Sequence, residues 1–208
     1  MKLEKPKLHN LEEKKILDCL ETKNFTNGLF KEKPEDDIII KDITFDTCVF
    51  ENIDFTKIKL ENVDLIDVHF KNCDLSNQNF DKQFLRRVLF ENCKLIGVSF
   101  IDASLKNIEF INCNAKYINF SSGKLVNLKI EESDFSESTF SRLDLTNLEL
   151  NNVKLHSTEF IRTNLKDTDF STCDITNILF DQTSLKGIVI DGFQAMNIAC
   201  LFGVKIKN

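Results

Sequence analysis

The chain has 208 residues, enough for one domain with its own core. Its net charge of −6 argues against direct binding of nucleic acid through a basic surface. The N-terminal sequence does not resemble a signal peptide, and no apolar run is long enough to span a bilayer. We therefore expect a cytoplasmic protein that makes no use of a membrane.

Residues 1–37 precede the regular part of the sequence and are expected to form an N-terminal cap segment. Asn10 followed by Glu13 is typical of a helix start, and the apolar positions that follow predict a short helix as far as Glu21. Phe25 and Phe30 already fall on the register of the repeat described next. This segment either covers the open end of the repeat or serves as an arm that binds a partner.

From Phe45 to Ile190 every fifth residue is bulky and apolar, and Ala115 is the one small exception. A period of five fits neither an α-helix nor an ordinary β-strand. A fixed period over such a length indicates an array of repeated units, which we place at residues 38–192.

A second period of twenty predicts how the array winds. Leucine recurs at twenty-residue intervals from Leu65 to Leu185, and phenylalanine does so from Phe80 to Phe180. Like residues lie over like residues only if each coil contains four pentapeptides. The sequence therefore predicts an all-β fold, a four-sided parallel β-helix of about eight coils, which is a rod of roughly 40 Å at the spacing between strands.

The position two residues before each large apolar residue holds mostly small or β-branched residues, which suit a narrow interior. Five of the seven cysteines occupy it, and Cys73, Cys93 and Cys113 are expected to lie over one another in successive coils. Two interpretations are open, a disulfide or buried reduced thiols, and a cytoplasmic protein favours the thiols.

Residues 193–208 depart from the repeat and are rich in large apolar groups. A helix is expected up to Phe202, with Gly203 ending it and a strand over Val204–Ile206. A single coil end needs fewer apolar groups than this, so the segment predicts a two-fold interface of a homodimer, with a monomeric cap as the alternative. The expected interface residues are Phe193, Met196, Ile198, Leu201, Phe202, Val204 and Ile206.

The sequences Asn62–Leu65, Asn72–Leu75 and Thr172–Ile175 resemble the signature of pentapeptide-repeat proteins. This resemblance implies a right-handed quadrilateral β-helix. Leu185–Ala195 also resembles the C-terminal segment of the Qnr quinolone-resistance branch, where it ends the last coil and opens a dimerisation module. The uninterrupted register indicates that the projecting loops of some relatives are absent.

The sequence offers no catalytic set, because its three histidines converge on no nucleophile or carboxylate pair, and it shows no phosphate loop or metal-ligand spacing. We therefore expect neither an enzyme nor a bound cofactor or metal.

One side of the predicted rod collects acidic residues, with Lys71 and Lys129 as its bases. Its acidic residues are Glu51, Glu91, Glu109, Glu131, Glu132, Glu149, Asp169 and Asp191. A long acidic rod is similar to duplex DNA in shape and charge. With the family resemblance, this implies a DNA mimic that binds DNA gyrase or topoisomerase IV, either to modulate the enzyme or to protect it from quinolones. The alternative is a scaffold with another partner, for which the stripe only keeps the surface hydrated.

Overall fold

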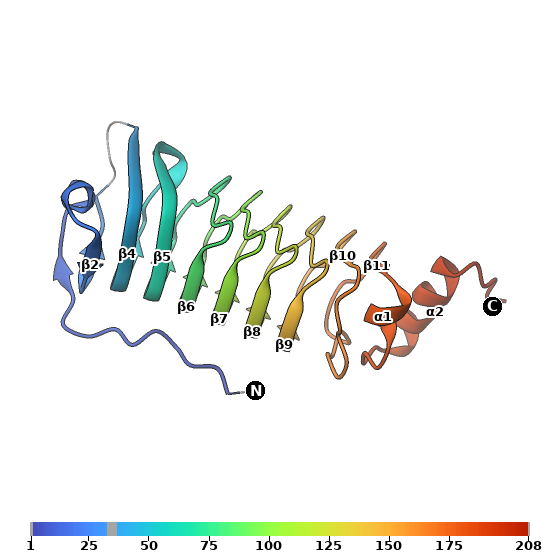
Figure 1. Ribbon diagram of the computed structural model, residues 1–208. Helices are drawn as coiled ribbons and strands as arrows, with labels where there is room; N and C mark the ends of the chain where they lie inside the picture. The colour runs from blue at the N-terminus through green and yellow to red at the C-terminus, as the bar shows by residue number, and fades with distance from the viewer. Residues whose placement is uncertain (1, 33–36, 208) are drawn as a thin grey trace.

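The computed structural model describes residues 2–32 and 37–207. It contains a parallel β-helix of about eight turns, so the predicted fold class is confirmed (Figure 1). The principal sheet runs in the order β4 (Ile38–Glu51), β5 (Ile58–Lys71), β6 (Phe84–Glu91), β7 (Ser104–Ile111), β8 (Lys124–Glu131) and β9 (Asp144–Asn151). Leu105 pairs with Leu85 on one side and Leu125 on the other, which confirms the twenty-residue coil.

The coils turn at residues in the left-handed backbone conformation, two positions after each large apolar residue. Asn, Asp and Gly adopt this conformation at least cost, and Asn72, Asn92 and Gly97 have φ of 54°, 54° and 69°. The corner side chains also hydrogen-bond from coil to coil, because Asn92 Nδ2 donates to Asn72 Oδ1 at 3.2 Å. Sequence and corner geometry therefore agree at these corners, whereas others, such as Lys82 and Tyr117 with φ of 62°, take the same conformation with less favourable residues.

The interior is filled by columns of stacked side chains. Phe50, Phe70, Phe90 and Phe110 lie with ring centroids 4.8–5.2 Å apart and ring planes within 11° of parallel. All four are at most 1% exposed. Burial of this apolar area supplies most of the stabilisation of each coil.

All seven cysteines lie in the described residues and are free thiols. Six of them are buried, and Cys93 Sγ donates to Phe70 O at 3.4 Å and to Glu91 O at 3.3 Å. Burial raises the pKa of Cys19 and of Cys113 to about 12. The interpretation as reduced thiols in the core is thus confirmed over a disulfide.

The N-terminal segment differs from the predicted helix. Asn10 has a φ of 48°, β1 (Glu12–Glu13) pairs with β3 (Gly28–Phe30), and only η1 (Ile16–Glu21) is helical, as a 3₁₀ helix. The α-helix from Asn10 was wrong because strand pairing replaces its first turn. Ile16 and Cys19 of η1 are buried in the core, so η1 covers the first coil.

Strand pairing begins before the expected start near Ile38. In β2 (Asn24–Thr26) Phe25 pairs with Phe45, and in β3 Phe30 pairs with Phe50. Both rings extend the core columns by one coil, which is why these strands form. The sequence Lys33–Asp37 is charged and contains Pro34, which predicts an interruption of the five-residue register, but residues 33–36 lie outside the described residues.

The remaining elements are short. They are η2 (Phe55–Lys57), β10 (Glu159–Phe160), β11 (Leu179–Phe180), α1 (Gln182–Leu185) and α2 (Gly192–Leu201). The predicted C-terminal helix is present as α2, capped by Asp191, which accepts from Gln194 N at 2.8 Å. The strand expected over Val204–Ile206 was wrong, since these residues pair with no strand in the described part of the chain.

The sheet ladder opens after β9. Leu143 N donates to Thr163 Oγ1 at 3.1 Å, and Asn152 N donates to Thr172 Oγ1 at 3.2 Å. Between these two contacts β9 forms the edge of the principal sheet among the described residues. A cleft of about 520 Å³ lies there, with Leu145 and Leu148 on one side and Asn164 and Lys166 on the other.

Candidate partner-binding surface

The second halves of strands β4–β9 form one wall of the rod, and the predicted acidic stripe lies on it. In the strand register, Lys71 pairs with Glu51 on one side and with Glu91 on the other. Lys129 pairs in the same way with Glu109 and Glu149. We call this the acidic wall, comprising the outward residues 49, 51 and 52 and their equivalents every twenty residues. The structure thus brings the predicted strand carboxylates onto one wall.

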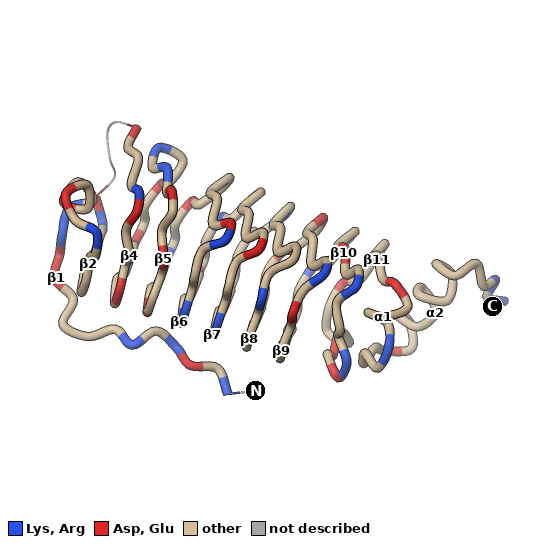
Figure 2. Tube along the Cα trace, viewed as in Figure 1, with Lys and Arg blue, Asp and Glu red and all other residues tan. Residues whose placement is uncertain are grey.

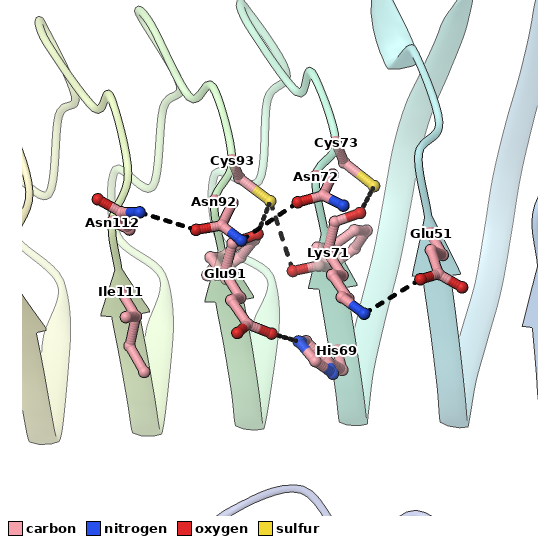
Figure 3. Close-up of polar contacts among 12 residues, drawn as sticks. Glu51, His69, Lys71, Asn72, Cys73, Glu91, Asn92, Cys93, Ile111 and Asn112 are labelled. Carbon is pink, nitrogen blue, oxygen red and sulfur yellow. Dashed lines mark hydrogen bonds and ion pairs between the residues drawn. The ribbon is translucent and has the colours of Figure 1, made fainter.

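Basic side chains on the acidic wall pair with several of these carboxylates. Lys71 Nζ lies 3.1 Å from Glu51 Oε1, and His69 Nε2 lies 2.9 Å from Glu91 Oε2 (Figure 3). Pairing with basic side chains on the adjacent strand therefore makes the wall less uniformly negative than the stripe predicted from sequence.

Lys129 continues this pairing further along the acidic wall. Its ammonium lies 2.7 Å from Glu131 Oε2 and 3.3 Å from Glu109 Oε1. The hydrogen bond with Glu131 raises the pKa of Lys129 and lowers that of Glu131. Lys129 and Glu131 therefore stay ionised at neutral pH.

The remaining predicted carboxylates differ in their surroundings. Glu149 is exposed, whereas Asp169 accepts a hydrogen bond from Ser171 N at 2.8 Å. Glu132 Oε1 accepts from Asn152 Nδ2 at 2.7 Å, and Asp191 caps α2. Glu132, Glu149, Asp169 and Asp191 are thus the exposed carboxylates of the acidic wall. Glu91 and Glu131 are half-exposed, and each is paired with a basic side chain.

Glu109 is an exception, because its side chain is only 3% exposed. Its Oε2 atom has no hydrogen-bond partner within the described residues. A partner could not reach this carboxylate without movement of the groups around it. Sequence spacing correctly placed Glu109 on the acidic wall but gave no sign of its burial.

His69 is largely buried beside Glu91. Burial favours the neutral imidazole and lowers the pKa of His69, and the attraction of Glu91 opposes this without reversing it. The imidazole therefore responds to acidification later than an exposed histidine would.

The corner beside the acidic wall carries a buried ion pair that the sequence analysis missed. Arg87 Nε donates to Asp67 Oδ1 at 2.5 Å, and Arg87 Nη2 also donates to Asp67 Oδ2. Burial alone would raise the pKa of Asp67, but the hydrogen bonds from Arg87 and from Lys7 N hold it below its ordinary value. The twenty-residue spacing of Asp67 and Arg87 was the signal that could have revealed the pair.

The predicted dimer residues form an apolar patch at the C-terminal end of the rod. Phe193, Leu201 and Phe202 are exposed by 77%, 52% and 61%, and Met196, Val204 and Ile206 are exposed as well. Ile198 instead packs against the core. Large exposed apolar groups in one place are typical of an interaction surface.

The described residues contain no group of three or more potential metal ligands. No described helix is long and apolar enough to cross a bilayer. A cleft of about 540 Å³ lies beside Ile39 and Lys57.

Two family models match the chain. The pentapeptide repeat region matches residues 63–140, and pentapeptide repeats (8 copies) match residues 138–177 and 149–187. Together the matches cover more than half of the sequence. No sequence among the curated proteins matches it.

Solved structures with a similar arrangement include QnrB1, a plasmid-mediated fluoroquinolone resistance protein, in a trypsin-treated form. It is 19% identical, over 88% of this chain and 97% of that chain, with a TM-score of 0.47. HetL, a pentapeptide repeat protein involved in heterocyst differentiation regulation in the cyanobacterium Nostoc, is 14% identical over 80% and 89% of the two chains, with a TM-score of 0.34. The repeat models, the twenty-residue coil and the filled four-sided interior agree, and the chain belongs to the pentapeptide-repeat family.

Proposed function

We propose that this chain is a non-enzymatic DNA mimic that binds a type II topoisomerase, DNA gyrase or topoisomerase IV. It would either modulate the enzyme or protect it from quinolones. The observation that carries the proposal is the acidic wall, whose carboxylates are attached to hydrogen-bonded strands at fixed spacing. The choice of target follows the resemblance of Leu185–Ala195 to the Qnr branch.

The acidic wall is rigid, and its charges are regularly spaced. Glu91 and Glu131 lie two coils apart in one column, which is about 10 Å at the usual strand spacing. Because the ladder already fixes their positions, little conformational entropy is lost when a basic surface binds them. Such a wall can take the place of a phosphate backbone in a positively charged groove.

The accessible charge lies towards the C-terminal half of the acidic wall. Glu149 is exposed, while Glu109 is buried and Glu51 is paired with Lys71. We therefore assign partner binding chiefly to Glu91, Glu131 and Glu149, with Asp169 beyond them. The other predicted carboxylates shape the field without direct contact.

A homodimer through the apolar C-terminal patch would extend the rod. Phe193 and Phe202 are the most exposed of its large residues. Joining two rods end to end gives a length of roughly 80 Å at the strand spacing. The proposal places the protein in the cytoplasm, where its buried thiols stay reduced.

A supercoiling assay tests this function. Purified gyrase is assayed at increasing concentrations of the protein, with and without ciprofloxacin. We expect inhibition of supercoiling, or restored supercoiling in the presence of the drug, at micromolar protein.

Two triple variants with the same change of net charge distinguish an effect of the acidic wall from an effect of net charge. E91Q/E131Q/E149Q neutralises the wall and is expected to lose at least tenfold in potency. E61Q/D102N/E137Q neutralises carboxylates on other walls and is expected to retain it. If both variants lose the same potency, the effect comes from net charge and not from the acidic wall. If the unsubstituted protein has no effect on gyrase, a scaffold with another partner is favoured.

A further inference from the structure

The N-terminal residues Lys2–Asn10, which we call the strap, run along the outside of the β-helix (Figure 1). Lys7 N donates to Asp67 Oδ1 at 2.9 Å on β5. Further along, Asn127 Nδ2 on β8 donates to Lys2 O at 3.4 Å. The strap thus crosses four neighbouring strands, and it does so without joining the sheet.

Charges on the strap match charges on the surface beneath it. Glu4 Oε2 lies 3.9 Å from Arg87 Nη1, and the positive charge of Lys7 acts on Asp67. Lys5 acts in the same way on Glu131 of the acidic wall. Figure 2 shows the basic and acidic positions of the strap below the strands. With three lysines and one glutamate, the strap is a basic segment seated beside an acidic wall.

Burial along the corner column shows what the strap covers. Asp67, Arg87 and Asn107 are 5%, 4% and 2% exposed. Asn147, in the same column and with the same backbone conformation, is exposed. The strap extends along the column only as far as Asn127, so the change from buried to exposed coincides with its end.

The acidic wall shows the same change two residues further along each coil. Glu109 is buried, whereas Glu149, two coils further along the same column, is exposed. We call the surface that the strap covers the groove. The corner column from Asp67 to Asn107 lies at its centre, and Glu109 and Glu131 lie beside it.

The strap is held by few contacts. Its polar anchors are the contacts at Asp67, Arg87 and Asn127, and Leu3 and Leu8 are only partly buried. Backbone that lies outside a sheet and buries little apolar area belongs to the least stable parts of a protein. Detachment of the strap would break these contacts and leave the strand pairing of the β-helix intact.

We propose that the strap is a removable cover, and that the groove beneath it binds an extended, lysine-bearing peptide segment of a partner protein in the strap's place. The strap demonstrates the fit, because it is itself such a segment. A partner segment then binds in competition with the strap. This inference requires a groove and a cover and does not depend on a topoisomerase being the partner.

The experiment uses the full chain with the strap lysines reversed. K5E/K7E places two negative charges opposite Glu131 and Asp67 and is expected to release the strap. K31E/K41E makes the same change of net charge at two exposed lysines outside the strap and serves as the control. Hydrogen exchange at the strap amides, Lys7 above all, should be at least tenfold faster in K5E/K7E and unchanged in the control.

A synthetic peptide with the sequence of residues 2–9 is the binding probe, labelled for fluorescence anisotropy. We expect it to bind K5E/K7E at least tenfold more tightly than it binds the unsubstituted protein or the control, and more weakly as salt rises. A peptide with glutamate at the positions of Lys5 and Lys7 should not bind. The proposal is overturned if the strap amides exchange no faster in K5E/K7E. It is equally overturned if the released strap leaves a groove that binds no peptide, or if the unsubstituted protein binds as well as the variant.

Discussion

Arg87 of β6 forms a two-point ion pair with Asp67 of β5, and both side chains are nearly inaccessible to water. Opposite charges at this depth stabilise the protein only while both are present. The pair joins two coils at the corner where the strap begins its path along the rod.

Removing the carboxylate alone should therefore destabilise the protein. Asp67→Ala leaves the guanidinium of Arg87 buried without its partner, and we expect a loss of about 3–5 kcal/mol in the free energy of unfolding. The double variant D67L/R87M replaces both charges with apolar groups and should recover most of that loss. Urea unfolding followed by circular dichroism measures both, and a double variant as unstable as the single one would contradict the account.

Stability should depend on pH through His69. Its pKa in the folded protein is lowered by burial, so the unfolded chain takes up the proton first as pH falls. The stabilisation that comes from neutral His69 is fully present above the pKa of histidine in the unfolded chain, about 6.5. It is lost as pH falls from there through the lower pKa of His69 in the folded protein. We expect the urea midpoint to decline over this window.

A variant isolates the contribution of this histidine. His69→Leu copies Leu89, its register partner in the next coil, and should flatten the dependence of the midpoint on pH. His156→Gln removes a histidine from another wall and is the control. An unchanged slope in His69→Leu would assign the effect to other groups.

Ala115 is the one small residue at a central position, and its surroundings explain it. The side chain is fully buried, and Phe135, one coil later in the same column, meets Phe110 edge to face at a centroid distance of 5.3 Å. Ala115→Leu is expected to overpack this region and to destabilise the protein by about 1–3 kcal/mol. Adding Phe135→Leu should restore part of the loss. Thermal unfolding of the two variants tests this, and a stabilised Ala115→Leu would show that the site holds unfilled space.

The apolar C-terminal patch predicts self-association. The unsubstituted protein should scatter light as a dimer, and F193D/F202D should scatter as a monomer, because each aspartate would be desolvated in the interface. Ile39→Asp changes another exposed apolar residue and should remain dimeric. A dimer that persists in F193D/F202D would place the interface elsewhere.

The repeat could be predicted because packing in this fold follows sequence spacing directly. Leu105 lies next to Leu125 since the two are one coil apart, and the same rule placed Glu91 and Glu131 in one column. Burial of Glu109 could not be predicted in this way. It coincides with a strap that lies before the repeat, where the five-residue spacing predicts no contact such as the one between Lys7 and Asp67.

The structure at the two ends of the chain, outside the repeat, could not be predicted from the sequence either. The polar and apolar pattern after Asn10 fits an α-helix, but strand pairing of Glu12 and Glu13 with β3 displaced its first turn. At the other end, the pattern of Val204–Ile206 fits a strand, yet these residues have no paired neighbour among the described residues. After Asn10, strand pairing overrode the local helix propensity. At Val204–Ile206, the residues have strand propensity but no partner strand among the described residues.

Displacement of DNA from the topoisomerase tests the central claim most directly. Gyrase bound to a labelled linear duplex is titrated with the protein, and release of the duplex is followed by fluorescence anisotropy. The account predicts full displacement at micromolar protein, with at least a tenfold weaker effect of E91Q/E131Q/E149Q. A duplex that stays bound at saturating protein, or a triple variant as effective as the unsubstituted chain, would contradict mimicry by the acidic wall.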